Sequence, residues 1–104
     1  MSLDNDFLYC KEIIKENSKS FYKAFSRLPK DKANAIFAVY AFCRTADDLI
    51  DLRNDAESLH LFKDELNLFS KGEIVDKPLW RALEEVFKNY NMDIKPFFEW
   101  LRAN

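Results

Sequence analysis

Three aspartates and an arginine lie within eight residues, in the segment 44–51 that reads RTADDLID. On a helix each residue advances about 100°, which places all four side chains within one arc of about 100°. The four are Arg44, Asp47, Asp48 and Asp51. Asp47 and Asp51 would stand one turn apart, with Cβ atoms about 5–6 Å from each other. Since Mg²⁺ prefers one or two carboxylates with waters and substrate phosphates, the three acids are candidate ligands of a magnesium–diphosphate site.

The alternative interpretation of this segment is a solvated acidic helix face. Like charges at i,i+4 cost about 0.2–0.5 kcal/mol, and anions are disfavoured at the negative end of a helix. Locally, Arg44 and Arg53 alone compensate these charges. A bound cation would relieve the conflict, which favours the metal interpretation.

The composition favours a single all-α domain. The chain has 104 residues, of which 48% are hydrophobic and ten are Phe, so a globular fold is expected rather than disorder. One Gly and three Pro leave few turn signals, as expected for long helices.

Charge and cysteine usage exclude other classes. The net charge is −2 and the basic residues are spread among the acids, so no nucleic-acid partner is expected. Cys10 and Cys43 lie in apolar helical patterns and are interpreted as buried free thiols, not zinc ligands. No secretion signal opens the chain and the apolar run 35–43 is too short to cross a bilayer, which predicts a cytoplasmic protein.

Hydrophobic periodicity predicts six helical segments, of which the second is short and the last covers about two turns. Ser20 is the expected cap of the second, Asn54 or Asp55 that of the fourth and Asp76 that of the fifth, while Gly72 ends the fourth. The expected helices cover residues 4–16, 20–28, 31–52, 56–70, a stretch from 77–78 onward, and a last one from 95–96.

The helix 31–52 should position the acids. Residues 35–43 are apolar on every side, so this helix should be buried all round by several neighbours, which suggests part of something larger. Phe37 and Tyr40 project on the same arc as Arg44, Asp47 and Asp51. Two interpretations stay equal here: a core helix with a solvated tip, or a slot for a ligand with an apolar tail and a charged head. His60 is expected to be exposed rather than catalytic.

Four short stretches resemble the squalene and phytoene synthases. They are Ser18-Lys19-Ser20-Phe21, Leu28-Pro29, the segment AVYAFCR at 38–44 and DDLID at 47–51. An Asp-Asp-x-x-Asp motif alone also occurs in chain-elongating prenyltransferases and terpene cyclases, but the upstream Ser-Lys-Ser-Phe and the Cys-Arg pair separate this family from those. The likeness covers the whole chain, more weakly over 70–104, and is strongest to the bacterial dehydrosqualene (diapophytoene) synthases.

The resemblance implies an all-α helical bundle around a central cavity, with residues 1–104 forming the N-terminal part of a class I isoprenoid synthase fold. Two aspartate-rich motifs would face each other and hold Mg²⁺. Asp47 and Asp51 match the metal ligands of the first motif, and Asp48 matches a motif acid with a less certain direct role. The other matching positions contact the diphosphate (Ser18, Ser20 and Arg44) or line the pocket of the isoprenoid tail (Phe21, Phe25 and Tyr40).

The implied activity is prenyl transfer, in which two farnesyl or geranylgeranyl diphosphates condense head to head in isoprenoid or carotenoid biosynthesis. Mg²⁺ and Arg44 would stabilise the charge that develops on the leaving diphosphate. A dry, apolar chamber would protect the allylic cation from water, and the family product arises through a cyclopropyl intermediate. The implied partners are an isoprenoid diphosphate substrate and, through the apolar product, peripheral contact with a membrane.

One departure from the family pattern concerns the second aspartate-rich motif, which nothing after residue 52 resembles. Half a metal site and half a cavity should not run the reaction, so the 104-residue chain by itself is expected to be inactive. The alternative hypothesis is a non-catalytic helical module, either a truncated remnant or an interaction domain. The exposed side of the apolar helix predicts self-association of the isolated chain.

Overall fold

The computed structural model describes residues 3–51 and 56–103, and within these ranges the chain forms six helices and no strand. The helices are α1 Leu3–Asn17, α2 Lys19–Ser26, α3 Lys30–Asp51, α4 Ala56–Ser70, α5 Pro78–Asn89 and α6 Lys95–Ala103. The predicted all-α class is confirmed, and the predicted helices agree with these bounds to within two residues. None of the described helices is long and apolar enough to cross a membrane.

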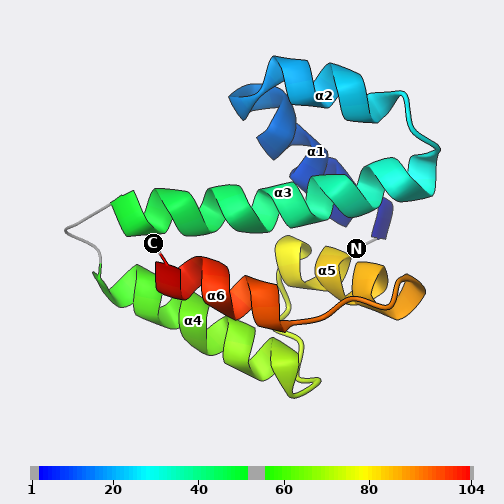
Figure 1. Ribbon diagram of the computed structural model, residues 1–104. Helices are drawn as coiled ribbons and strands as arrows, with labels where there is room; N and C mark the ends of the chain where they lie inside the picture. Colours follow the sequence, from blue (N-terminus) through cyan, green and yellow to red (C-terminus); the bar gives the residue numbers. More distant parts are fainter. Residues whose placement is uncertain (1–2, 52–55, 104) are drawn as a thin grey trace.

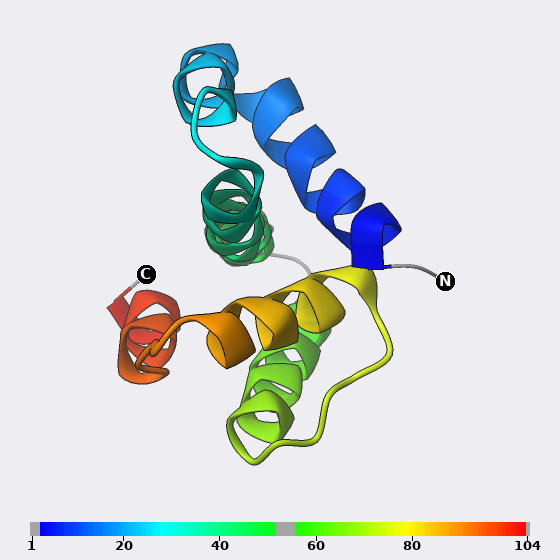
Figure 2. The same cartoon turned by 90° about the vertical axis from the view of Figure 1, so that its right-hand side faces the viewer.

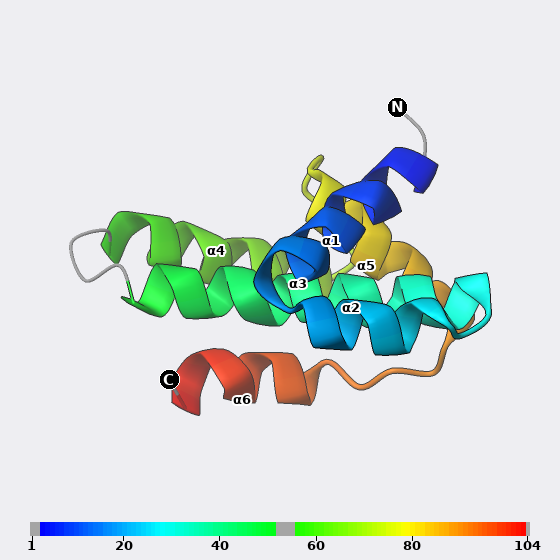
Figure 3. The ribbon, with the colours of Figure 1, turned by 90° about the horizontal axis from the view of Figure 1, so that it is seen from above.

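The long helix α3 runs through the middle of the molecule. Figure 1 shows α1 and α2 on one side of α3, and α4, α5 and α6 on the other. Helix α1 packs against both α3 and α5, whereas α2 packs against α1 and α3. Figure 2 shows the same two groups of helices from the side, and Figure 3 shows α1 crossing above α3 towards α5.

The core below α3 is aromatic. Phe42 of α3 lies with its ring centroid 5.3 Å from Phe62 of α4, 6.1 Å from Trp80 of α5 and 4.9 Å from Phe97 of α6. Aromatic pairs at such distances stabilise by about 0.5–1.5 kcal/mol beyond the area they bury. Phe42 therefore ties α3 to three helices at once.

Small side chains on α3 accompany its close packing with α1. Ala38 and Ala41 are fully buried, as are Cys10 and Ile14 of α1. An alanine adds little bulk beyond the backbone, so a facing helix can approach closely and gain many dispersion contacts. Small side chains on α3 and buried apolar side chains on α1 thus both favour the packing of these two helices.

Two nearly buried acids hold the start of α5. Asp6 of α1 accepts hydrogen bonds from Arg81, at 2.8 Å from Nη2 and 3.0 Å from Nε. Glu65 of α4 accepts one from Trp80 Nε1 at 2.8 Å and another from Lys77 Nζ at 2.6 Å. Buried carboxylates are tolerated when they are paired and hydrogen-bonded in this way. The first turns of α5 are consequently anchored to both α1 and α4.

The predicted cap of α2 is wrong by two residues. Ser18, not Ser20, is the N-cap: its backbone is extended and its Oγ accepts a hydrogen bond from the backbone N–H of Phe21 at 3.3 Å. Both serines are good capping residues, and the break after α1 falls before the first of them. The caps expected at Asn54 or Asp55 lie outside the described residues.

The predicted cap of α5 is also wrong, whereas the predicted end of α4 is confirmed. Lys77 is the N-cap of α5 and makes no side-chain capping bond. The carboxylate of Asp76, the expected cap, is paired with Arg81 instead.

Gly72 has φ +86° and follows α4, and its N–H donates to the carbonyl of Phe69 at 3.0 Å. Glycine adopts this left-handed conformation without steric cost, which explains the helix end at this point.

Candidate functional site

The acidic segment lies in the last two turns of α3. The helix continues through Asp51, so Asp47 and Asp51 stand one turn apart on the same side. Asp47 is half-buried and Asp51 is exposed. Within the described ranges neither carboxylate forms an ion pair, and the last turn of α3 holds no basic residue. Their mutual repulsion, at the negative end of a helix, is the electrostatic situation that a bound cation would relieve.

Arg44 and Asp48 form an ion pair one turn apart on α3. Arg44 Nε lies 3.1 Å from Asp48 Oδ1, and the two side chains are 42% and 55% exposed. The Nε atom itself is buried, and among the described residues no acceptor lies in a direction that its N–H could use. A pair this exposed contributes at most about 1 kcal/mol. The guanidinium therefore keeps donor capacity for another anion.

The donor set fits half of a magnesium site. Over residues 3–51 and 56–103, no three His, Cys, Asp or Glu side chains converge closely enough to hold a metal ion. Asp48 lies against Arg44, which leaves Asp47 and Asp51 as a pair. Mg²⁺ commonly takes one or two carboxylates and completes its six ligands with water and substrate phosphates. The pair suits that chemistry, and the ligand roles of Asp47, Asp48 and Asp51 stay predictions.

An apolar groove lies on the same side of α3. It has a volume of about 500 Å³. Its walls come from α3 and from the segment between α5 and α6: Ala35, Ile36, Val39, Tyr40, Cys43, Tyr90 and Met92. Ile36, Tyr40 and Cys43 precede Asp47 by eleven, seven and four residues, which is the spacing of one helix side. One side of α3 is therefore apolar along the groove and acidic immediately after it.

The Cys43 thiol lies in the groove and is close enough to Asp47 for that carboxylate to raise its pKa. Burial raises the pKa of Cys43, and the negative charge of Asp47 raises that pKa further. At neutral pH the thiol is consequently uncharged and contributes an apolar surface to the groove. The prediction of two free thiols is confirmed for both cysteines, although Cys10 is fully buried and Cys43 only partly.

The predicted place of Phe37 in this wall is wrong. Phe37 is 3% exposed, and its ring lies 6.2 Å from that of Tyr22, beneath α2. Ile36 and Cys43 line the groove beside Tyr40, where Phe37 had been expected. Both residues share the helical spacing of Tyr40 and Asp47, although no polar residue within 35–43 marks that side as the open one.

Helix α2 carries the other predicted site residues. It runs antiparallel to α3, so its first residues lie towards the Arg44 end (Figures 1 and 3). The rings of Phe21 and Phe25 are 5.8 Å apart, with Phe21 half-exposed and Phe25 half-buried. Neither ring lines the groove beside Tyr40. The predicted tail-binding residues thus form two separate surfaces.

Within the described ranges the two serines form no hydrogen bond with the arginine. Ser18 caps α2 and Ser20 is exposed, and in the described part of the chain no hydrogen bond joins either of them to Arg44. Both remain near the N-terminal end of α2, where backbone N–H groups favour an anion. His60 is exposed as predicted and lies 3.6 Å from Asp64, far along the chain from these groups.

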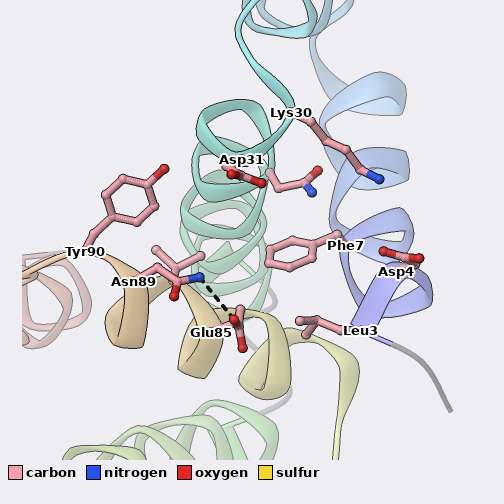
Figure 4. Close-up of a pocket in the computed structure, with 10 residues that line it drawn as sticks. Leu3, Asp4, Phe7, Lys30, Asp31, Glu85, Asn89 and Tyr90 are labelled. Carbon is pink, nitrogen blue, oxygen red and sulfur yellow. Dashed lines mark hydrogen bonds between the residues drawn. The ribbon is translucent and has the colours of Figure 1, made fainter.

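A second pocket of about 500 Å³ lies at the opposite end of α3 (Figure 4). It is lined by the start of α1, the start of α3 and the end of α5, and holds the acids Asp4, Asp31 and Glu85 beside Lys30. Asn89 Nδ2 donates a hydrogen bond to Glu85 Oε1 at 3.0 Å, across one turn of α5. None of the predicted site residues lines this pocket, and its excess of acids does not suit a diphosphate.

Comparison with known proteins decides the family. Residues 14–104 match the squalene/phytoene synthase family, which is most of the chain. The chain belongs to this family. The matched range includes the motif stretches of α2 and α3, and α3 carries the acids and one wall of the groove.

Relatives of this squalene/phytoene synthase chain point the same way. It is 48% identical over 59 residues to a 4,4'-diapophytoene synthase of Staphylococcus haemolyticus, covering 57% of this chain and 21% of that protein. It is 29% identical over 92 residues to a phytoene synthase of Arthrospira platensis, covering 85% of this chain and 29% of that protein. A crystal structure of a dehydrosqualene synthase in complex with a ligand aligns with TM-score 0.92 and 52% identity, over 96% of this chain and 35% of that one. The chain thus spans between a fifth and about a third of the length of these relatives.

Proposed function

We propose that this chain forms one wall of a synthase that joins two isoprenoid diphosphates head to head. The observation that carries the proposal is the continuity of α3, on which Ile36, Tyr40 and Cys43 of the groove share one side with Asp47. Such a side matches a ligand with an apolar tail and a charged head. The family membership and the names of the relatives support the same substrate class.

The charged head would bind at the C-terminal end of α3. Asp47 and Asp51, assisted by Asp48, would hold Mg²⁺, which when bound neutralises the diphosphate and makes it a better leaving group. Arg44 has a side chain that is 42% exposed and a planar fork that suits phosphate oxygens. Ser18 and Ser20 would complete the contacts from α2.

The apolar tail would lie along the groove by Tyr40, with Phe21 and Phe25 as a second apolar surface. As the C1–O bond breaks, its electron pair leaves with the diphosphate and an allylic cation remains. Apolar walls exclude the water that would otherwise capture that cation. The double bond of the second substrate then forms a bond to C1, and loss of a proton closes the cyclopropyl intermediate. That intermediate loses the second diphosphate with its electron pair, rearranges, and gives up another proton to yield the head-to-head product. A product this apolar would also bring peripheral contact with a membrane.

A second candidate function is a non-catalytic helical module. The observation that favours it is that, over the described ranges, no three His, Cys, Asp or Glu side chains converge closely enough to hold a metal ion. On that hypothesis the acids of α3 would be a solvated face, and their replacement would change no activity in any setting.

The experiment that separates the two supplies the other half of the site. A chimera joins residues 1–104 to the remaining part of the Staphylococcus haemolyticus relative and is incubated with Mg²⁺ and farnesyl or geranylgeranyl diphosphate. We expect a C30 or C40 hydrocarbon by mass spectrometry, and none from the 104-residue chain alone. Asp47→Asn should lower the rate by about 100-fold or more, since it removes charge stabilisation from the transition state.

The control is Asp64→Asn, which removes an exposed acid of α4 whose ion-pair partner in the described part of the chain is His60. This variant should keep the rate of the parent chimera. Equal rates for the parent and Asp47→Asn, with unchanged helical content by circular dichroism, would contradict the proposed site and favour the non-catalytic module.

A further inference from the structure

Tyr90 contributes to two cavities of the structure. It lines the apolar groove on α3 and also the acidic pocket at the N-terminal end of that helix, and among the described residues it is the one that lines both. Figure 4 shows its ring on the side of the acidic pocket away from α1, beside the start of α3. Tyr90 therefore lies where the groove ends and the acidic pocket begins.

The surroundings of a hydrocarbon would change at Tyr90. On one side the groove is apolar along α3, from Cys43 near the acids to Ala35. On the other side the pocket carries polar groups, which include Asp31, Asn34, Glu85 and Asn89. A hydrocarbon that covered these groups would displace their water without offering hydrogen bonds, which costs free energy. An apolar tail is therefore stabilised as far as Tyr90 and not beyond it.

The backbone holds Tyr90 in place at the end of α5. Its N–H donates a hydrogen bond to the carbonyl of Val86 at 2.9 Å, and its own carbonyl accepts one from the N–H of Met92 at 2.9 Å. Val86 is 2% exposed and belongs to the core, while Tyr90 is 37% exposed, so most of its surface is covered. A side chain on a backbone that is fixed in this way is suited to limit the length of a ligand.

The length of the apolar wall corresponds to a tail of three isoprene units. Between Cys43 and Ala35 the helix rises by about 12 Å. An extended chain gains about 1.2 Å per bond, so a farnesyl tail spans about 14 Å and a geranylgeranyl tail about 19 Å. With its diphosphate beside Asp47, the farnesyl tail would end near Tyr90. The longer tail would extend about 5 Å further, into the acidic pocket.

We propose that Tyr90 closes the far end of the groove and limits the tail of the ligand to about three isoprene units. The ring excludes a longer tail by its volume, and the hydroxyl is not required. This inference rests on the proposed function, because it needs the head of the ligand at the acids of α3. It adds the residue that selects the tail length.

Titration calorimetry of the 104-residue chain with three diphosphates of increasing tail length tests the proposal. Geranyl, farnesyl and geranylgeranyl diphosphate are compared in the presence of Mg²⁺, below the concentrations at which they form micelles. From geranyl to farnesyl the affinity should rise at least about tenfold, because more apolar surface is buried. From farnesyl to geranylgeranyl it should rise less than about twofold, because the last unit meets Tyr90 and the polar groups beyond it.

Variants at Tyr90 assign the limit to its ring. In Tyr90→Ala the step from farnesyl to geranylgeranyl should become at least about fivefold, since the space of the ring accommodates more of the tail. Tyr90→Phe should keep the preference of the parent. The matched control is Tyr9→Ala, because Tyr9 is 44% exposed on α1 and lies outside the groove, and it should also behave like the parent. Circular dichroism checks that each variant keeps its helices.

Filling the same end of the groove tests the proposal in the opposite direction. Ala35 lines the groove at its far end, and Ala35→Phe should reduce the step from geranyl to farnesyl to less than about threefold. This variant leaves Tyr90 unchanged, so it tests the limit even if Tyr90→Ala does not fold. An unchanged step in a folded Ala35→Phe chain would count against the proposed end of the groove.

Three results would overturn the proposal. They are the same steps in Tyr90→Ala as in the parent, a full tenfold rise from farnesyl to geranylgeranyl in the parent, and affinities that do not depend on tail length. Asp47→Asn in the same assay separates this inference from the proposed function, because it should weaken all three ligands by the same factor. If Asp47→Asn has no effect while Tyr90→Ala changes the length preference, the proposed diphosphate site fails and the limit at Tyr90 remains. The reverse result would overturn the role of Tyr90 alone.

Discussion

Asp6 and Arg81 are 75 residues apart in the sequence and are joined by two N–H···O hydrogen bonds. The planar guanidinium presents two donors to the two carboxylate oxygens, which is the strongest geometry for such a pair. The hydrogen bond to Asp6 is the main reason that the pKa of Arg81 is raised. Side-chain exposure is only 5% for Asp6 and 21% for Arg81, so water does not replace either partner easily.

We predict that Asp6→Asn destabilises the fold by about 3 kcal/mol, because removal of one partner leaves the other charge uncompensated. Urea unfolding followed by circular dichroism measures the change. Asp4→Asn is the matched control, since Asp4 is exposed in the same first turn of α1, and it should cost less than about 0.5 kcal/mol. The double variant Asp6→Leu with Arg81→Met should recover most of the loss. Similar losses in Asp6→Asn and Asp4→Asn would show that the pair is unimportant.

Asp51 and Asp48 should differ in their effect on diphosphate binding. Titration calorimetry of inorganic diphosphate with Mg²⁺ should show at least about tenfold weaker binding for Asp51→Asn, since one of two facing carboxylates is lost. Asp48→Asn should cost less than about threefold, because Asp48 is occupied by Arg44 and its removal frees the guanidinium. The reverse order, or no dependence on Mg²⁺, would refute the assignment of Asp47 and Asp51 as the facing pair.

The buried Cys10 thiol predicts a loss of stability in alkali. Burial raises the pKa of Cys10 from 9.0 to about 12 in the folded chain, and the charge of Asp6 adds to this shift. Between pH 9 and about 12 the unfolded chain loses the thiol proton, whereas the folded chain keeps it. The free energy of unfolding therefore has its full value below about pH 9 and falls as the pH rises to about 12. Compared with Cys10→Ala, the parent chain should therefore lose up to about 4 kcal/mol more over that range. Parallel stability curves for the two proteins would contradict this prediction.

The groove on α3 predicts self-association of the 104-residue chain. Burying about 500 Å² more apolar surface would stabilise by about 12 kcal/mol, against association costs of about 4–15 kcal/mol. Val39→Lys places a charge in the groove and should shift the chain towards monomer in sedimentation velocity. Leu61→Lys is the control on α4, where Leu61 is 53% exposed outside the groove. A compact monomer at high concentration in the parent chain would refute the prediction.

Periodicity and turn chemistry were sufficient to predict the helices and the acids at the end of α3. Helical spacing alone puts Asp47 and Asp51 on one side, and Gly72 alone signals the end of α4. The face of Phe37 could not be predicted in this way. Residues 35–43 contain no polar residue to distinguish the buried side from the open one, so only the neighbouring helices decide which side is covered.

The buried acids were beyond the reach of local patterns. Asp6 and Glu65 look like ordinary exposed acids in the sequence, and their partners lie 75 residues and up to 15 residues away. The predicted cap of α5 was wrong for the same reason, because the carboxylate of Asp76 forms an ion pair with Arg81. A tertiary contact overrides a local preference in each of these cases.

The packing of α1 between α3 and α5 also sets an order of events during synthesis. Asp6 of α1 is made 75 residues before Arg81, its partner on α5. At about 5–20 residues per second, that interval lasts roughly 4–15 s. Helix α1 first gains α3 as a neighbour, when Lys30–Asp51 have been made, and gains α5 only at the end of the interval. Until then a chaperone that shields apolar helices would find the face of Cys10 and Ile14 at least partly open.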